Sequence, residues 1–592
     1  MRGETQQLLR TTKFSENLWC CRPRRRERPH TTEYNGILFW KHLFSVAAAA
    51  AAAAVVATTL VGNAIISQVV AFSFVKRNLG DCGLRTQHCP DTGNAIDKVV
   101  RLSNHPFPSL IPRKALSSSM MTKDSNNDDD GKNENHDDAP VILLIGSCGL
   151  DRLLTVANYP TVDAKIRTIA YNEEGGGNSA NTATTIGKLV GAGLFSSSGQ
   201  KMRVEFLSKV GDDAVGQQLI DELNGSNVGT SLHLFRRGEV GSTTAFTTVI
   251  VSESEQTRTC IHTPGTCGEL SIVDDVQSLS QEDINQIFRN VVHLHSDSRH
   301  TDVALWMAKE AKRRGGITVS CDCEKDRNTK ALDELIELCD VLITNSNHLG
   351  EYLERLTRER EVITGRQPLP EPTIAINTQE ARGAESSSLD QRREHQRIET
   401  CVKSLAPSTY FARWQSQESF IGKEVVVTHG SMGALHYKTV EISTARDGSN
   451  TKPHNTIEIE MDETKILRVR QSFGDGEENS KVLYEIHQAG VLKNPKIVDT
   501  TGAGDAFIGG FILTSNTAFE KEQEEIMGGR VQLALEMGSF VGGCKLGGPG
   551  ARSALPTERD IDLLGPNLTA AKASLRNLLG SFNDVKLYPN RY

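Results

Sequence analysis

The stretch Asp499-Thr-Thr-Gly-Ala-Gly-Asp505-Ala-Phe507 leads directly into an apolar run that ends at Leu513. Unpaired backbone amides and the helix dipole form an anion site at a helix start, and here the small residues would supply those amides: Gly502, Ala503 and Gly504. An aspartate beside an anion site is electrostatically costly unless it moves a proton. Asp505 is therefore predicted to be a general base that accepts a hydroxyl proton during phosphate transfer. The alternative is a plain loop in which Asp505 only caps the helix.

Length and composition limit the classes of protein to consider. A chain of 592 residues predicts one large or two medium folded units with tails. A net charge of −8 argues against non-specific nucleic-acid binding, because no strong basic field surrounds the chain. The 12 cysteines include no Cys-x-x-Cys pair. This pattern favours buried thiols in a reducing compartment over a disulfide framework or a zinc site.

The N-terminal part shows three zones ahead of the domain. Residues 1–42 are polar and basic, residues 43–75 carry no charge and include an alanine tract, and residues 76–139 end in an acidic stretch that predicts a disordered linker. Residues 43–75 fit a signal anchor, the core of a cleaved targeting sequence or an alanine expansion. The basic flank favours targeting. The Ala71-Phe72 step resembles the bipartite plastid presequences of algae with complex plastids, so we expect plastid targeting or membrane anchoring.

Residues 140–560 show alternating strand and helix patterns. Short β-branched or apolar runs are separated by segments of helical period at Ser179–Val190, Asp302–Arg314 and Lys330–Leu338. This alternation predicts an α/β fold with a mostly parallel sheet, whose ligands lie beyond the carboxyl ends of the strands. The strand runs are Val141–Ile145, Val204–Leu207, Val291–Leu294, Ile317–Cys321, Val341–Ile343 and Val425–Val427.

Two polar segments interrupt this pattern. Residues 357–420 and 443–480 show no apolar period, so we expect surface insertions with no part in the core. Residues 561–592 are expected to form an amphipathic C-terminal tail.

Two glycine motifs near the first strand predict a polyol site. Gly146-x-x-Gly149-Leu150-Asp151 places an aspartate at the carboxyl edge of the sheet, where it could accept hydrogen bonds or simply end a turn. The cluster Gly175–Gly177 allows close backbone approach, and the amides that follow, Asn178 and Asn181, offer donors and acceptors. A flexible loop with an asparagine cap is the alternative.

Three further segments complete the pattern. Residues 165–171, 243–251 and 258–261 are expected to form a small sheet over the site, on which Arg258 would face transferring phosphate or simply be solvated. After the strand run 425–427, Thr428-His-Gly430-Ser-Met-Gly433 is typical of a turn along which a nucleotide can lie.

Together these motifs resemble the ribokinase (PfkB) family of carbohydrate kinases, and within it the ketohexokinase and fructokinase-like branch. The resemblance implies a three-layer α/β sandwich with a small β-sheet lid. It implies sugar binding by Asp151, Gly176, Gly177, Asn178, Asn181 and Arg258. It implies nucleotide binding by Asn345, Thr428, Gly430, Gly433, Gly547 and Gly548.

The resemblance also implies cofactors. ATP with magnesium is expected, and a potassium site at Asp499 and Thr501 is left open. The family usually has a glutamate three positions after Asn345, where this chain has His348; the next acid is Glu351. Histidine is a poor ligand for magnesium, so metal use could be altered, Glu351 could take part, or catalysis could be weak.

We therefore expect ATP-dependent phosphorylation of a small sugar of the ketohexose, fructose or ribose class. A nucleoside kinase of the same fold and a catalytically weak, kinase-like scaffold are the alternatives. The expected partners are sugar and ATP without nucleic acid, with membrane contact through residues 43–75 and a homodimer through the lid also considered.

Overall fold

The computed structural model describes most of the chain between Asp138 and Phe582. The described residues are 138–194, 201–255, 257–325, 327, 329–346, 355, 373–376, 421–446, 454–461, 466–474, 478–518, 529–565 and 568–582. They all belong to the second of two compact units, Asp130–Tyr592. The predictions for residues 1–42, for residues 43–75, for the linker up to residue 137 and for most of residues 357–420 lie outside them. No helix in the described part has the length and apolarity needed to span a membrane.

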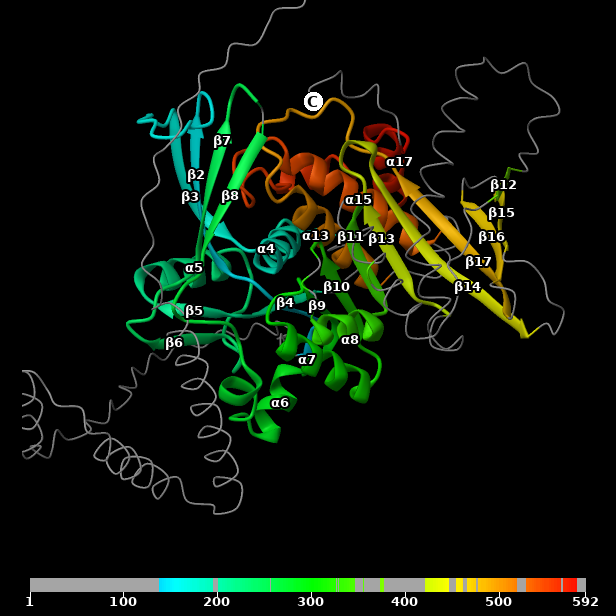
Figure 1. Ribbon diagram of the computed structural model, residues 1–592, viewed down its shortest axis with the longest axis horizontal. Coiled ribbons are helices and arrows are strands. Elements are labelled where there is room, and N and C mark those ends of the chain that lie inside the picture. The colour runs from blue at the N-terminus through cyan, green and yellow to red at the C-terminus, as the bar shows by residue number, and fades with distance from the viewer. Residues whose placement is uncertain are drawn as a thin grey trace, which may run out of the picture. The chain divides into compact units, whose positions relative to one another are not determined.

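The centre of this unit is an 11-stranded sheet in the order β12-β15-β16-β17-β14-β13-β11-β10-β9-β1-β4 (Figure 1). The last six strands in this order, from β13 to β4, run parallel to one another. They correspond to the six strands predicted from the sequence. The predicted parallel α/β sheet is therefore confirmed. The six strands are β4 (Arg203–Leu207), β1 (Val141–Ile145), β9 (Val291–Ser296), β10 (Thr318–Cys323), β11 (Val341–Asn345) and β13 (Glu424–Thr428).

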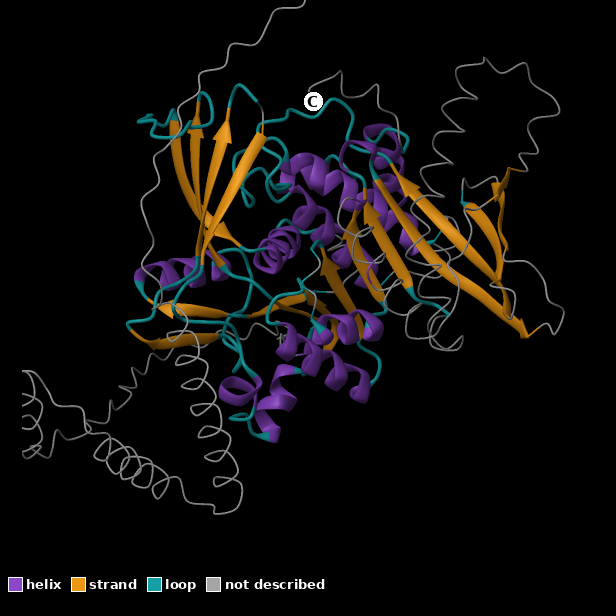
Figure 2. Ribbon diagram, viewed as in Figure 1, coloured by secondary structure: helices purple, strands orange, loops and turns teal. Residues whose placement is uncertain are grey.

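Strand β1 is buried on both of its faces, as expected of an inner strand of a parallel sheet. Ile142 and Leu144 pack into one cluster, with helices α4 (Asn178–Gly191), α13 (Ala503–Asn516) and α15 (Arg530–Lys545). Leu143 and Ile145 pack into the other, with α7 (Thr301–Arg314) and α8 (Lys330–Leu338). Figure 2 shows helices on both faces of the sheet, which gives the predicted three layers.

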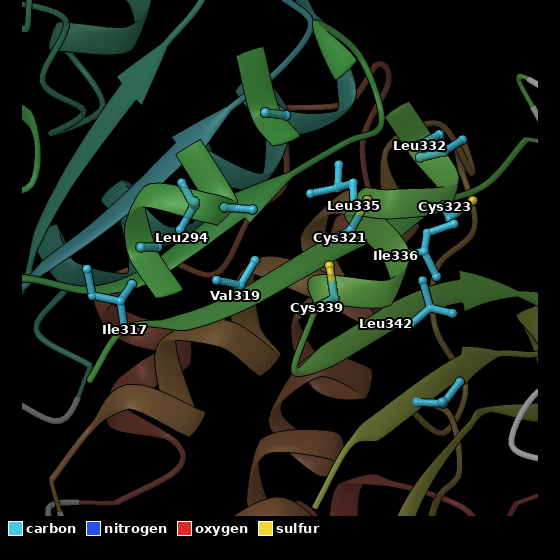
Figure 3. Close-up of a cluster of buried hydrophobic side chains, with 14 of the residues drawn as sticks. Leu294, Ile317, Val319, Cys321, Cys323, Leu332, Leu335, Ile336, Cys339 and Leu342 are labelled. Carbon is cyan, nitrogen blue, oxygen red and sulfur yellow. The ribbon is translucent and has the colours of Figure 1, made fainter. Parts of the chain in front are cut away.

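Helix α8 shows how one of these layers is built. Thr329 caps its start by accepting a hydrogen bond from the amide of Leu332. Leu332, Leu335 and Ile336 then lie on one side of the helix and pack against β10 and β11, where Cys321, Cys323 and Leu342 are also buried (Figure 3). Each apolar side chain of this size stabilises the fold by about 1.5–3 kcal/mol. Of the seven described cysteines, four are buried as predicted, whereas Cys260 is exposed and Cys267 and Cys544 are partly exposed.

An antiparallel extension of the sheet corrects the prediction for residues 443–480. These residues contribute to β14 (Ala434–Arg446), β15 (His454–Met461), β16 (Leu467–Gly474) and β17 (Glu478–Ala489). In β16, Leu467 and Val469 are buried whereas Arg468 and Arg470 are exposed. The strand thus alternates with a period of two, and its many charges hid this alternation. Strand β12 (Thr373–Ile376) pairs with β15, so these four residues of the segment 357–420 also belong to the sheet.

A second sheet of four strands, here called the lid sheet, has the order β3-β2-β7-β8. Its strands are β2 (Gly149–Val156), β3 (Ala170–Gly176), β7 (Phe246–Ser252) and β8 (Thr257–Thr263). The predicted small sheet is confirmed, except that residues 165–169 and 243–245 belong to no strand.

The remaining elements connect these layers. They are β5 (Lys209–Asp212), β6 (Arg236–Val240), α5 (Ala214–Asn224), the π-helix η3 (Ile272–Val276), α6 (Gln281–Ile287), the 3-10 helix η5 (Gly430–Met432), α16 (Glu558–Asp562) and α17 (Leu568–Leu578). Helix α17 buries Ala571 and Leu575 in the core. The chain from residue 568 to residue 582 is thus part of the domain and not a tail, although the helix is amphipathic as predicted.

Candidate active site

The turn before α13 has the geometry of an anion site. Gly502 lies at the N-cap with φ +71°, and a side chain there would meet Ala551, because a Cβ would lie 2.6 Å from Ala551 Cβ. The amide of Ala503 donates to Thr500 O at 3.3 Å. Within the described part of the chain, the amide of Gly504 has no hydrogen-bond acceptor, and no atom lies within 4 Å of a Cβ built on Gly504. The turn therefore has an amide without an acceptor at a helix start, and the space on the Cβ side of Gly504 is open.

Asp505 lies in the first turn of α13, directly after this amide. Its Oδ2 accepts a hydrogen bond from Asn181 Nδ2 at 2.9 Å. Burial raises the pKa of Asp505 to about 7, the hydrogen bond from Asn181 opposes the rise, and the charges of Glu324, Asp297 and Asp151 add to it. A carboxyl group that ionises near neutral pH is well matched to accepting a proton from an alcohol.

The side chain of Asn181 is held from its other end by Arg552. Arg552 Nε donates to Asn181 Oδ1 at 2.9 Å, and Arg552 Nη2 donates to Gly176 O at 3.1 Å. An ion pair of 3.4 Å with Glu222 completes the contacts of the buried guanidinium group. Arg552 thereby orients the amide that faces Asp505. The sequence prediction missed Arg552, which stands two residues after the glycine-rich segment 547–550.

The predicted glycine motif brings Asp151 into the same group of side chains. A Cβ on Gly176 would lie 2.4 Å from the carboxyl group of Asp151, so only glycine lets this carboxyl group approach. Gly177 has φ +97°, and Asn178 begins α4 with its amide bonded to Ser147 Oγ at 3.1 Å. Burial raises the pKa of Asp151 to about 6, while the charge of Arg552 lowers it.

Two acidic residues that sequence reasoning missed lie nearby. Asp297 follows β9, and its Oδ2 accepts from Ser147 N at 2.9 Å and from Ser179 N at 3.1 Å, which ties the turn after β1 to the start of α4. Asp322 is buried in β10, and burial together with Glu324 and Asp505 raises its pKa well above the usual range. Asp505 thus shares its surroundings with several carboxyl groups.

Arg258 and Thr500 connect the lid sheet to the same turn. Arg258 Nη1, from β8, donates to Thr500 Oγ1 at 2.6 Å. The predicted arginine therefore lies beside the start of the anion turn.

Two of the predicted nucleotide-binding residues lie side by side at the carboxyl edge of the sheet. Asn345 ends β11 and Thr428 ends β13, and they are register partners in neighbouring parallel strands. Gly430 and Gly433 follow with φ values of +56° and +111°, which a turn of this shape requires. His348 and Glu351, on which the magnesium prediction turned, lie outside the described residues.

Asp499 and Thr501, the candidate potassium ligands, are hydrogen-bonded to each other. Asp499 Oδ1 accepts from the amide of Thr501 at 2.9 Å and from its hydroxyl group at 2.8 Å, and Asp499 Oδ2 accepts from Gly550 N at 2.8 Å. The carbonyl oxygens of Asp499 and Gly548 accept from Lys545 Nζ at 3.1 Å and 3.3 Å. These donors leave no oxygen of Asp499 without a partner.

The other predicted glycine, Gly547, precedes Gly548 in the same loop, where its amide donates to Cys544 O. Among the described residues there is also no cluster of three or more histidine, cysteine or acidic side chains that could hold a metal ion.

Comparisons with known proteins give a family, a relative and several solved structures that are similar to this chain. A family model described as "pfkB family carbohydrate kinase" matches residues 140–406 and 483–558, more than half of the chain. The ATP-dependent ribose-1-phosphate kinase of Halopiger xanaduensis is 28% identical over 218 residues, which are 36% of this chain. The matched part spans 64% of that relative's length, which is less than two thirds.

Among solved structures, ribokinase from Giardia lamblia has a TM-score of 0.45 at 16% identity and covers 72% of this chain and 98% of its own. Ribokinase from Arabidopsis thaliana, complexed with ribose and ATP, has a TM-score of 0.43 at 19% identity and covers 72% of this chain and 100% of its own. The family match, which includes both the glycine motif and the Asp505 turn, is decisive: this chain belongs to the pfkB family of carbohydrate kinases.

Proposed function

We propose that this protein phosphorylates a hydroxyl group of a small sugar with ATP, and that Asp505 is the general base. The single observation that carries this proposal is the pairing of a carboxyl group of pKa about 7 with a free helix N-terminal amide one residue away. Family membership supports the class of reaction.

The reaction would proceed by direct transfer. Asp505 accepts the proton of the sugar hydroxyl group, whose oxygen attacks the γ-phosphorus of ATP, and ADP leaves. The amide of Gly504 and the positive end of the α13 dipole face the place where negative charge spreads over the phosphoryl oxygens. Magnesium would arrive with ATP as part of that substrate.

The sugar site is proposed around Asp151, Asn178, Asn181 and the backbone of Gly176 and Gly177. Support comes from the hydrogen bond between Asn181 and Asp505, from the close approach of Asp151 to Gly176, and from Arg258 of the lid sheet, which bonds Thr500. The acceptor is expected in the ketohexose, fructose and ribose class. Because one relative is named a ribose-1-phosphate kinase, a sugar phosphate is added to these acceptors.

The nucleotide would lie at the carboxyl ends of β11 and β13. Asn345 and Thr428 supply side-chain donors and acceptors there, and the turn from Gly430 to Gly433 runs beside them. Ligands of open α/β sheets bind at such strand ends. Gly547 and Gly548 would approach the nucleotide from the loop after α15.

The decisive experiment measures sugar-dependent ADP release by the wild type and by Asp505→Asn. We expect the variant to lose at least about a hundredfold in kcat while ATP still binds, because general-base catalysis contributes about 10²–10⁴. Asp562→Asn, which changes an exposed aspartate at the end of α16, is the matched control and should keep wild-type turnover. Near-normal turnover of Asp505→Asn would refute the assigned role.

The same assay separates the alternatives. Fructose, ribose, ribose 1-phosphate and adenosine are offered as acceptors in parallel. Turnover with adenosine alone would favour a nucleoside kinase, and ATP binding without transfer to any acceptor would favour the scaffold interpretation.

A further inference from the structure

Lys545, the last residue of α15, is fully buried with 0% of its surface exposed. A buried ammonium group is strongly unfavourable unless other groups replace its hydration shell. For Lys545, the hydration shell is not replaced by an ion pair. Among the described residues, no carboxylate oxygen lies within 4.0 Å of Lys545 Nζ.

The hydrogen-bond partners of this ammonium group are backbone carbonyl oxygens. Nζ donates to Asp499 O at 3.1 Å and to Gly548 O at 3.3 Å. Carbonyl dipoles that converge on a single positive charge are the environment that proteins use to bind dehydrated monovalent cations. In this protein the positive charge among these carbonyl groups is the ammonium group of Lys545.

The two carbonyl groups belong to two segments of the candidate active site. Asp499 begins the turn that ends in Gly504 and Asp505, and Gly548 begins the loop that leads to Arg552. Backbone bonds from Val498 and Asp499 to Leu546 O already hold these segments together at one end. The ammonium group adds a charged contact between the two segments.

We propose that Lys545 replaces a bound monovalent cation in this protein, so that neither catalysis nor folding requires potassium. Lys545 is a positioning residue, because it acts through the turn before Asp505 and the loop before Arg552. This inference rests on the proposed kinase function for its activity measurements but not for its stability measurements.

The first experiment compares the wild-type full chain in potassium chloride and in tetramethylammonium chloride at equal ionic strength. We expect kcat and the melting temperature to be the same in both salts. A several-fold rise of kcat, or a rise of the melting temperature that is specific to potassium, would overturn the proposal.

The second experiment removes the ammonium group. In tetramethylammonium chloride, Lys545→Ala should lose about 10- to 100-fold in kcat, because small displacements of catalytic groups reduce rates strongly. Potassium or ammonium ions should restore most of this loss and raise the melting temperature. Lys545→Met, which fills the space with an apolar chain, should lose activity without rescue. An alanine variant that neither ion rescues, in activity or in stability, contradicts the replacement.

The matched control is Lys188→Ala. Lys188 also donates its Nζ to a backbone carbonyl, Arg552 O at 2.8 Å, but its side chain is partly exposed and makes this one hydrogen bond within the described part of the chain. Any loss in this variant should not respond to potassium, and an equal potassium rescue would contradict a role specific to Lys545. If the wild type shows no kinase activity with any acceptor, the proposed function fails, and the melting temperatures still test Lys545.

Discussion

Asp505 should make the protein less stable at the pH where it is active. The pKa of this group is about 7 in the fold, against an ordinary value of 3.8. Between these pH values the folded state holds a proton that the unfolded chain releases, so the free energy of unfolding falls as the pH rises from about 4 to about 7. Active sites commonly lower stability in this way.

We therefore expect Asp505→Asn to melt at a higher temperature than the wild type at pH 8, with a difference that shrinks toward pH 4. Thermal unfolding at several pH values measures this, with Asp562→Asn as the control that should follow the wild type. A wild type more stable than Asp505→Asn at pH 8 would contradict the raised pKa. On the same basis, kcat/KM of the wild type should fall below about pH 7.

The sequence predicted only part of this arrangement at the scale of single residues. Asp505 and Asn181 each stand in a glycine-bearing motif, so both could be named without knowing that they meet. Asp297 stands in no such motif, and Arg552 follows a glycine-rich segment that does not indicate its contacts. They act by contacts with segments far away in the sequence, and spacing along the chain gives no information about those contacts.

Strand β16 gives a test at the scale of elements. Val469 is buried whereas its neighbour Arg468 is exposed. Val469→Asn should lower the free energy of unfolding by about 3 kcal/mol, since it removes apolar contacts and buries an amide. Arg468→Asn introduces the same side chain on the exposed face and should cost at most about 1 kcal/mol. Urea unfolding compares the two, and equal losses would mean that the described register of β16 is wrong.

The inner strands were predictable and the outer ones were not, for a physical reason. β1, β9, β10, β11 and β13 are buried on both faces and therefore appear as apolar runs. β15 and β16 bury one face and expose charges on the other. Their alternation of period two is spread over short segments with many arginines and glutamates, and such a pattern resembles a polar loop.

At the scale of the whole molecule, the order of motifs along the chain was enough to predict the layers. The glycine motif opens α4, the Asp505 turn opens α13, and these two helices pack on the same face of the sheet. The family match omits residues 407–482, and four strands of the main sheet lie within this gap: β13, β14, β15 and β16. The matched segments therefore leave out the inner strand β13 as well as most of the antiparallel extension.

Arg258 of the lid sheet and Thr500 of the turn before α13 are 242 positions apart in the sequence. The hydrogen bond between them joins the lid sheet to that turn. If the lid sheet opens to release a ligand, this contact would break and the lid sheet would move against solvent friction. If opening limits turnover, kcat should fall in proportion to viscosity as sucrose is added. Thr500→Val should weaken that dependence, whereas Thr500→Ser, which keeps the hydroxyl group, should preserve it. A kcat indifferent to viscosity in all three proteins would instead place the slow step in the chemistry.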